Sequence, residues 1–158
     1  MTATRFSAWR PSRPDVLNTE QHAFLQAHRT ATLATADAGG APHALPVCFL
    51  ADTGTAYIAI DQKPKSGDPR ALKRLRNIQT NPQVALVADR YDDADWSRLG
   101  WVMVRGKAEL LKGGAEYADA QARLKQRYMQ YQAMALDGLP VIAIRIEKVT
   151  CWGELKAD

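Results

Sequence analysis

Residues 55–78 read TAYIAIDQKPKSGDPRALKRLRNI, and the hydrophobic period of this stretch changes once along its length. In its first part Ala56, Ile58 and Ile60 face one side of an extended chain, and the residues between them face the other. Alternation of this kind is typical of a β-strand. The first part therefore predicts a strand over Thr55–Asp61.

The second part of the stretch has helical spacing. Leu72, Leu75 and Ile78 recur every three residues, so they would line one side of a helix. Asp68 suits a helix N-cap, and Pro69 suits the first helical residue because its missing N–H needs no partner there. The stretch as a whole predicts a strand that is followed by a helix beginning at Asp68 and Pro69.

Cationic side chains gather where this strand and this helix meet. Six of them lie between positions 63 and 76, with one acid, Asp68, among them. They are Lys63, Lys65, Arg70, Lys73, Arg74 and Arg76. A helix N-terminus offers unpaired N–H groups and a positive dipole end, so a phosphate or carboxylate is favoured there. The pattern predicts a site for an anionic ligand; a solvated helix face is the alternative interpretation, because net charge alone does not define a site.

The rest of the chain has the pattern of short strands and two further helices. The expected strands cover 30–36, 43–51, 84–88, 101–111 and 141–149, and the expected helices cover 19–28 and 115–131. Six or so strands joined mostly by short turns predict a closed or nearly closed antiparallel barrel with helices at its ends. Residues 1–18, rich in Arg, Pro and Ser, are predicted to form a flexible N-terminal arm, and residues 19–158 a single domain.

Composition argues against several classes of function. The net charge is +4 and the charges outside the cationic cluster are mixed, so a nucleic-acid-binding surface is not indicated. No apolar run approaches the ~20 residues that a membrane helix needs, and no secretory signal is visible. Cys48 and Cys151 lie far apart and outside any CxxC motif, so both are expected to be reduced residues of a cytoplasmic protein.

Motifs for metal binding and hydrolysis are missing from the sequence. His22, His28 and His43 have no Cys or His at the spacing of metal ligands. The sequence also lacks GxSxG, a Walker loop, and a GxGxxG that opens a helix after a strand. If the protein is an enzyme, a bound cofactor is therefore expected to perform the bond-making chemistry.

Several stretches together resemble a known family. The most specific are IDQKPK at 60–65, RLRNIQTNP at 74–82 and YDDADWSRLGWVMVRG at 91–106, and the early strand pair and the closing VIAIRIEKVTCWG agree with them. Over about residues 25–153 the chain resembles the pyridoxamine 5′-phosphate oxidase-like split-barrel proteins that bind FMN or F420. Within them it is most similar to the F420-dependent oxidoreductases, F420 being a deazaflavin with a phosphate and an oligoglutamate tail. The resemblance implies a mainly β (α+β) fold, a six-stranded antiparallel split β-barrel with flanking helices.

The resemblance also implies where the cofactor lies. The strand at 32–35 would run beside the tricyclic ring, the cationic stretch would meet the phosphate, and the loop at 96–98 of a second subunit would cover the ring in a homodimer. The implied cofactor-binding residues are Thr32, Leu33, Ala34, Thr35, Pro46, Lys63, Lys65, Ser66, Arg70, Lys73, Trp96 and Arg98. Pro46 cannot donate to a strand ladder, so on its own it predicts an edge, a bulge or a lined cavity.

The activity implied is hydride transfer between F420 and a small organic acceptor, with no catalytic residue and no metal assigned. FMN is the alternative cofactor, because it places a phosphate and a tricyclic ring in similar positions. The chain lacks the C-terminal substrate-binding arginine and histidine of the parent oxidases, which argues against vitamin B6 oxidation. Two non-enzymatic alternatives stay open: a carrier of a flavin or tetrapyrrole, and an interaction protein that binds no small molecule. The expected partners are a second copy of the chain and a small redox substrate, without nucleic acid or membrane.

Overall fold

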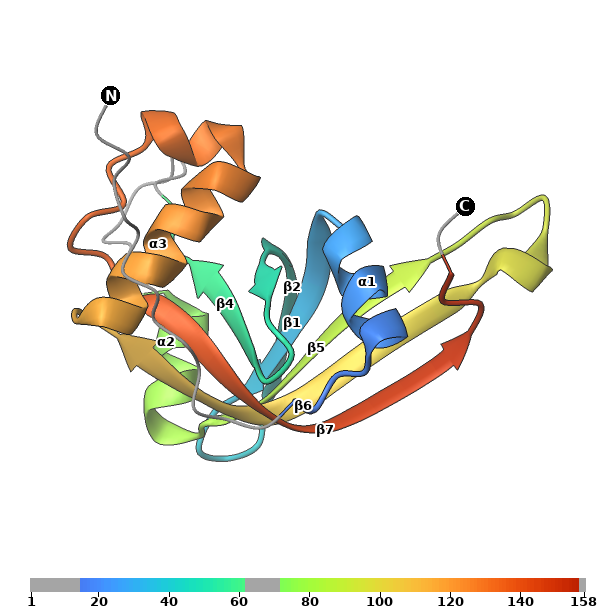
Figure 1. Cartoon of the computed structure of the whole chain (residues 1–158). Coiled ribbons are helices and arrows are strands. Elements are labelled where there is room, and N and C mark those ends of the chain that lie inside the picture. The colour runs from blue at the N-terminus through green and yellow to red at the C-terminus, as the bar shows by residue number, and fades with distance from the viewer. Residues whose placement is uncertain (1–14, 62–71, 157–158) are drawn as a thin grey trace, which may run out of the picture.

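The computed structural model describes residues 15–61 and 72–156, and they form one curled antiparallel sheet with helices packed against it (Figure 1). The strands are β1 Thr30–Ala36, β2 Pro42–Cys48, β3 Leu50–Ala51, β4 Thr55–Ala59, β5 Gln83–Arg90, β6 Gly100–Leu111 and β7 Val141–Gly153. Their order across the sheet is β2-β1-β5-β6-β7-β4-β3, and every pairing is antiparallel. The predicted mainly β split-barrel fold is confirmed.

The two edges of this sheet are joined by a single residue. β2 lies at one end of the strand order and β3 at the other, yet only Phe49 separates them in the sequence. The sheet must therefore curl until its edges approach each other. The prediction of one strand over 43–51, and hence of six strands, is wrong because the chain leaves one edge at Cys48 and enters the other at Leu50.

Three α-helices and two 3-10 helices accompany the described strands. They are α1 Thr19–Ala27, α2 Lys73–Thr80, α3 Ala115–Arg127, η2 Trp96–Arg98 and η3 Met129–Ala133. α1 begins with a capping box. The Gln21 backbone N–H donates to the Asn18 side chain, and the Asn18 backbone N–H donates to the Gln21 side chain. The predicted helix over 115–131 ends earlier, because Tyr128 is extended and the chain then tightens into η3.

α2 begins later than the sequence predicts. Leu72, its N-cap residue, has an extended backbone with φ −61° and ψ 143°, and Lys73 is the first helical residue. Asp68 and Pro69, the predicted start, lie outside the described residues. Leu75 and Ile78 are buried as their spacing predicts.

Two apolar clusters lie on opposite sides of the sheet. Inside the curl, Leu33, Leu86 and Val104 pack with Phe24 of α1 and Leu75 of α2, among others. On the outer side, α3 and η3 pack against β3, β4 and the start of β7 in a second cluster. β4 is therefore buried on both faces, which its alternating sequence does not reveal.

The start of the described chain is packed rather than loose. The backbone N–H groups of Val16 and Leu17 both donate to the Thr53 carbonyl oxygen at 2.9 Å, and Leu17 is 3% exposed. The predicted flexible arm does not extend through these residues; its first 14 positions lie outside the described residues. Across the part of the chain that the structure covers, no helix has the length and apolar character needed to cross a membrane.

Candidate functional site

A cavity opens where the two sheet edges approach each other. Its volume is about 160 Å³, and β2 and the end of β4 form its main walls. The lining residues are Thr30, Leu45, Pro46, Val47, Cys48, Ile58, Ala59, Asp61, Arg74 and Tyr131. We call it the split cavity. It lies at the place where a curled sheet leaves backbone groups of an edge strand accessible.

Pro46 lies in β2, which is an edge strand of the described sheet. An edge position tolerates the missing N–H of proline, so the prediction of an edge or a lined cavity is confirmed. Pro46 is opposite Thr32 in the β1–β2 register, and residues directly opposite each other share a face. Pro46 and Thr32 therefore belong to the same outer face of the sheet.

The predicted ring-contact strand, β1, divides its side chains between two faces. Leu33 is fully buried in the interior cluster, and Thr35 accepts a 3.0 Å hydrogen bond from Asn77 Nδ2 inside the barrel. Thr32 and Ala34 are half-buried and point outward. Only these two can present side chains to a ring that lies on the outer face beside Pro46. The assignment of these positions to a cofactor stays a prediction.

The predicted anionic anchor is described only in part. Lys63, Lys65, Ser66 and Arg70 lie outside the described residues. Lys73, the first residue of α2, forms an exposed ion pair with Asp37 at 3.9 Å. This pair connects α2 to the turn between β1 and β2.

Arg74, which the sequence placed in the cationic cluster but not among the predicted cofactor contacts, lines the split cavity. Its Nε atom is buried and has no hydrogen-bond partner among the described residues. Burial lowers the pKa of Arg74, and the charge of nearby Asp61 offsets part of that effect. Arg74 precedes Ile78 by four residues, one helical turn, and this spacing is the signal that could have placed it on the inner side.

Tyr131 faces the same cavity from η3 and is 4% exposed. Burial, together with the nearby side chain of Cys48 and its hydrogen bond, raises the pKa of Tyr131 above its usual range. Its hydroxyl stays protonated over the physiological pH range and is engaged with the Cys48 side chain. Both cysteines of the chain are described, and they are not joined by a disulfide.

The predicted ring cover, Trp96 and Arg98, lies far from the split cavity within one chain. η2 sits beyond the ends of β5 and β6, at the opposite end of the molecule from α3 (Figure 1). Trp96 is 69% exposed, and Arg98 Nε lies 3.2 Å from an Asp92 carboxylate oxygen. If these residues cover a ligand, they do so from a second copy of the chain.

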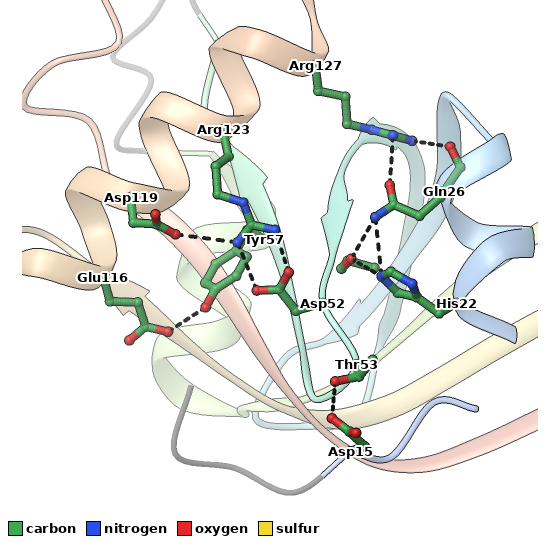
Figure 2. A network of polar contacts seen from close by, with 11 residues as sticks. Asp15, His22, Gln26, Asp52, Thr53, Tyr57, Glu116, Asp119, Arg123 and Arg127 are labelled. Carbon is green, nitrogen blue, oxygen red and sulfur yellow. Dashed lines mark hydrogen bonds and ion pairs between the residues drawn. The ribbon is translucent and has the colours of Figure 1, made fainter. Parts of the chain in front are cut away.

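A clasp of two residues at the end of α3 fixes the joint between the sheet edges. Arg127 donates from Nε to the Phe49 carbonyl oxygen at 2.9 Å, and also to the His28 carbonyl oxygen. The Tyr128 hydroxyl accepts from the Phe49 N–H at 3.0 Å and lies 2.8 Å from the Arg29 carbonyl oxygen. Figure 2 shows Arg127 reaching across to Gln26 of α1. Because Phe49 joins β2 to β3, this clasp holds the joint between the two edge strands against α3.

Ion pairs fix the rest of α3 to the sheet. Arg123 pairs with Asp52 and with Asp119, and Glu116 accepts a 2.7 Å hydrogen bond from the Tyr57 hydroxyl (Figure 2). Glu116 also pairs with Arg145 of β7, which lowers the pKa of Glu116. These contacts belong to the scaffold and lie outside the split cavity.

The histidines do not form a metal centre. A ring nitrogen of His22 lies 2.9 Å from the Ala51 carbonyl oxygen, and one of His28 lies 2.7 Å from that of Phe24. Among the described residues, no three His, Cys, Asp or Glu side chains are grouped closely enough to hold a metal ion.

Comparison with known proteins identifies the family. The family model described as pyridoxamine 5′-phosphate oxidase matches residues 17–153, which is most of the chain. The chain belongs to the pyridoxamine 5′-phosphate oxidase family. A relative in Streptomyces rimosus subsp. rimosus, 5a,11a-dehydrotetracycline/5a,11a-dehydrooxytetracycline reductase, is 32% identical over 109 residues, which are 66% of this chain and 74% of that protein.

Solved structures share the fold of this family member at low sequence identity. The heme storage protein HutZ from Vibrio cholerae has a TM-score of 0.67 and 18% identity, covering 87% of this chain and 94% of that one. A conserved hypothetical protein of Mycobacterium tuberculosis, Rv2991, has a TM-score of 0.69 and 18% identity. The match covers 91% of this chain and 90% of that one. At such identities these likenesses support the split-barrel fold and nothing finer.

Proposed function

We propose that this protein is an oxidoreductase that binds F420 at the split and reduces a small, electron-poor organic acceptor. The observation that carries the proposal is the similarity of this chain to a reductase of 5a,11a-dehydrotetracycline, 32% identical over 109 residues. The name of that relative describes reduction of a dehydro compound, which agrees with an unsaturated acceptor. F420 is preferred to FMN on the sequence resemblance described above.

The described residues fit such a cofactor. The split cavity offers a cationic guanidinium with a buried donor, and the outer face beside it carries the small or flat side chains of Thr32, Ala34 and Pro46. When bound, F420 supplies the hydride. The chain itself would position the ring, exclude water and hold the anionic groups, because positioning and a dry site contribute much of the rate in such enzymes.

The anchoring role of Lys63, Lys65, Ser66 and Arg70 is part of the proposal, although these residues lie outside the described ranges. Cations at the end of a strand and before a helix are suited to a phosphate, since charge-assisted hydrogen bonds are short and strong. Lys73 is a weaker candidate because it already pairs with Asp37.

A homodimer is also part of the proposal. No described helix covers the outer face of β1, β5 and the first half of β6, where Val87, Met103 and Trp101 are half-buried. Trp152, 56% exposed, lies opposite Trp101 in the register. A second copy packed on this face could bring its η2 segment over a bound ring. The predicted cytoplasmic location belongs to this proposal as well.

Cofactor titration tests the proposal directly. Purified protein is titrated separately with F420 and with FMN while the fluorescence of each cofactor is followed. We expect F420 to bind with a micromolar or lower dissociation constant. We also expect the protein to oxidise reduced F420 in the presence of an unsaturated ketone or quinone. Binding of FMN alone would move the assignment to an FMN-dependent oxidoreductase of the same family.

A carrier without turnover is the second candidate, and the fold shared with a heme storage protein is the reason to test it. Hemin titration followed by its Soret absorbance gives the answer. We expect no saturable hemin binding. The His22 and His28 rings already contact backbone carbonyl oxygens, so His43 of β2, whose Nδ1 is buried without a partner among the described residues, is the histidine to replace if hemin does bind. Tight retention of hemin or a flavin, with no turnover across a broad acceptor panel, would replace the enzyme proposal by the carrier.

A further inference from the structure

A groove on the outer side of the sheet gathers three cations. Its volume is about 290 Å³, and we call it the bulge groove. Its lining includes Gln83, Arg105, Lys107, Glu147 and Lys148. Arg105 and Lys107 are exposed and alternate along β6 with Val104 and Ala108, which are buried in the interior cluster. The two cations therefore point away from the core, since successive side chains of a strand face opposite sides of the sheet.

A β-bulge shapes this groove. Arg105 is opposite Lys148 in the β6–β7 register, but the register shifts before Gly106, so Glu147 has no opposite residue on β6. A side chain at position 106 is excluded, because a Cβ there would lie 1.9 Å from the Arg145 carbonyl oxygen. Glycine at this position therefore lets β7 approach β6 closely and keeps the bulge where it is.

The cations of the bulge groove have no partners within the described chain. Arg105 is directly opposite Lys148, and like charges placed opposite each other destabilise a sheet. Lys107 adds a third positive charge, and Glu147 is the one acid among the described lining residues. None of these four side chains forms an ion pair or a hydrogen bond with another residue of the ranges 15–61 and 72–156. A local conflict of this kind is expected at a functional surface, where a negatively charged partner relieves it.

Negative charge gathers on the turn between β5 and η2, at the end of the molecule opposite α3 (Figure 1). We call residues 91–95 the acidic turn, because Asp92, Asp93 and Asp95 follow closely within it. Asp92 pairs with Arg98, and both Asp92 and Asp95 accept hydrogen bonds from backbone N–H groups of the segment itself. Asp93 is exposed and accepts a 2.9 Å hydrogen bond from the Tyr91 hydroxyl, but no cation of the described chain neutralises it. The turn is thus held in shape with a carboxylate at its outside.

We propose that the bulge groove is the docking site for the acidic turn of a second copy of this chain. The turn does not reach the groove of its own chain, because Gly100 and Arg105 are separated by about 17 Å along extended β6. In a dimer with two-fold symmetry each copy supplies one groove and one turn, so the contact forms twice. Opposite charges on the two surfaces attract and fix the register in which the copies meet.

The same docking would bring Trp96 to the predicted ring site, and in this respect the inference rests on the homodimer of the proposed function. Thr32 is in register with Met103 across β5, and Arg105 lies two residues beyond Met103 on the same face. With strands ~4.8 Å apart and residues ~3.4 Å apart, Arg105 lies about 12 Å from Thr32. Asp93 and Trp96 are three residues apart in the sequence, an extended span of at most about 11 Å. One acidic turn with its η2 segment therefore spans both places.

Charge reversal on either surface tests this docking. The groove variant carries Arg105→Glu and Lys148→Glu, and the turn variant carries Asp93→Lys and Ala94→Lys, which leave the carboxylates that shape the turn in place. Each variant alone brings like charges together at both contacts, so its dimer dissociation constant should rise by about 100-fold or more. An equimolar mixture of the two variants has opposite charges at both contacts of a mixed dimer. The dissociation constant of that mixed dimer should return to within about 10-fold of the wild-type value.

Sedimentation equilibrium without any cofactor measures these dissociation constants, after circular dichroism has shown that each variant is folded. The control carries Lys112→Glu and Lys125→Glu, which change the net charge as the groove variant does, but just before α3 and in its last turn. The control should dimerise as the wild type does. Raising the salt concentration from about 50 to about 500 mM should weaken the wild-type dimer, because salt screens exposed charges.

The proposal is overturned if the wild type is a monomer throughout the micromolar range, if both charge-reversed variants dimerise as the wild type does, or if their mixture dimerises no better than either alone. Should a charge-reversed variant fail to fold, neutral substitutions replace it: Arg105→Gln with Lys148→Gln in the groove, and Asp93→Asn in the turn. Each should weaken the dimer about 3- to 10-fold. A dissociation constant equal to that of the wild type would then overturn the proposal.

Titration with F420 separates this contact from the proposed function. If the wild type dimerises as expected but does not bind F420, the oxidoreductase proposal fails and the docking contact stands. If the groove variant is monomeric and still binds F420 as tightly as the wild type, the docking contact stands and Trp96 does not cover the ring.

Discussion

The second half of α3 and the split between the sheet edges use arginine in opposite ways. Along α3, Arg123 and Arg127 have their donors occupied by carboxylates or carbonyl oxygens from distant parts of the chain. At the split, Arg74 is held in a cavity where its Nε lacks an acceptor among the described residues. Paired cations hold the scaffold together, whereas Arg74 lies near the charge of Asp61 and keeps a buried Nε that no described residue accepts from. The difference predicts that mutations on the two sides separate stability from binding.

The largest effect expected is on cofactor binding, from replacing Lys63 and Lys65 together with alanine. If each makes a charge-assisted hydrogen bond worth about 1.5–3 kcal/mol, binding should weaken by about 3–6 kcal/mol. The free energy of unfolding should change little, because exposed charges contribute little to stability. Fluorescence titration and urea unfolding measure the two quantities. Unchanged binding by a folded double variant would refute the anchoring role.

Phe49→Ala should cause the largest loss of stability. Phe49 is fully buried at the joint between β2 and β3, and truncating a buried phenylalanine costs about 3–5 kcal/mol. The split should also lose its fixed width, so cofactor affinity should fall as well. Urea unfolding with cofactor titration measures both, and Phe24→Ala is the matched control, since Phe24 is equally buried but lies on α1. Equal losses of affinity in both variants would contradict a special role for the joint.

Arg127→Gln should destabilise the fold by about 3 kcal/mol. It removes charged donors from the Phe49 and His28 carbonyl oxygens, and such hydrogen bonds are worth about 1.5–3 kcal/mol each without being additive. Lys125→Gln serves as the control, because Lys125 pairs at 3.8 Å with a highly exposed Asp137. Chemical denaturation of the two variants should differ clearly; similar midpoints would show that the clasp is not a stabilising feature.

Glu116→Gln should lower the free energy of unfolding by about 2 kcal/mol at neutral pH. It should also make that free energy depend less on pH on the acid side. The hydrogen bond from Arg145 lowers the pKa of Glu116, against the smaller opposing effect of burial. A carboxyl with a lowered folded-state pKa stabilises above its unfolded pKa, and this stability is lost as pH falls through the folded pKa. Urea unfolding between pH 7 and pH 3 should therefore show a steeper decline for the wild type than for the variant. Parallel profiles would show that this carboxyl does not contribute to acid unfolding.

Periodicity in the sequence was sufficient to predict most of the elements. The alternation over residues 55–61 and the three-residue spacing of Leu72, Leu75 and Ile78 depend on local backbone geometry, which each segment expresses by itself. Strand ends were less well predicted: β5 and β7 continue past the predicted limits, because pairing with β6 extends them beyond the apolar pattern. The break at Phe49 was missed because no turn residue marks it.

The candidate site was predicted in part from the sequence. The edge position of Pro46 follows from its missing N–H, and it lines the split cavity as expected. Arg74 and Tyr131 were missed. Arg74 had been counted in the cationic cluster but not among the cofactor contacts, and Tyr131 had no predicted role at the end of the expected helix over 115–131. Local spacing does not state which element of the barrel a side chain will face.

The sequence by itself determined the types of element, the family and the cationic character of the segment around residues 63–76, because these depend on neighbours along the chain. Only the tertiary structure decided that the sheet edges meet through Phe49 and that Arg74 turns into the gap between them. Both outcomes follow from the curl of a seven-stranded sheet, which brings residues from β2, β4, α2 and η3 to one place. A cation becomes a binding group there because burial removes its water, and that burial is set by segments distant in sequence.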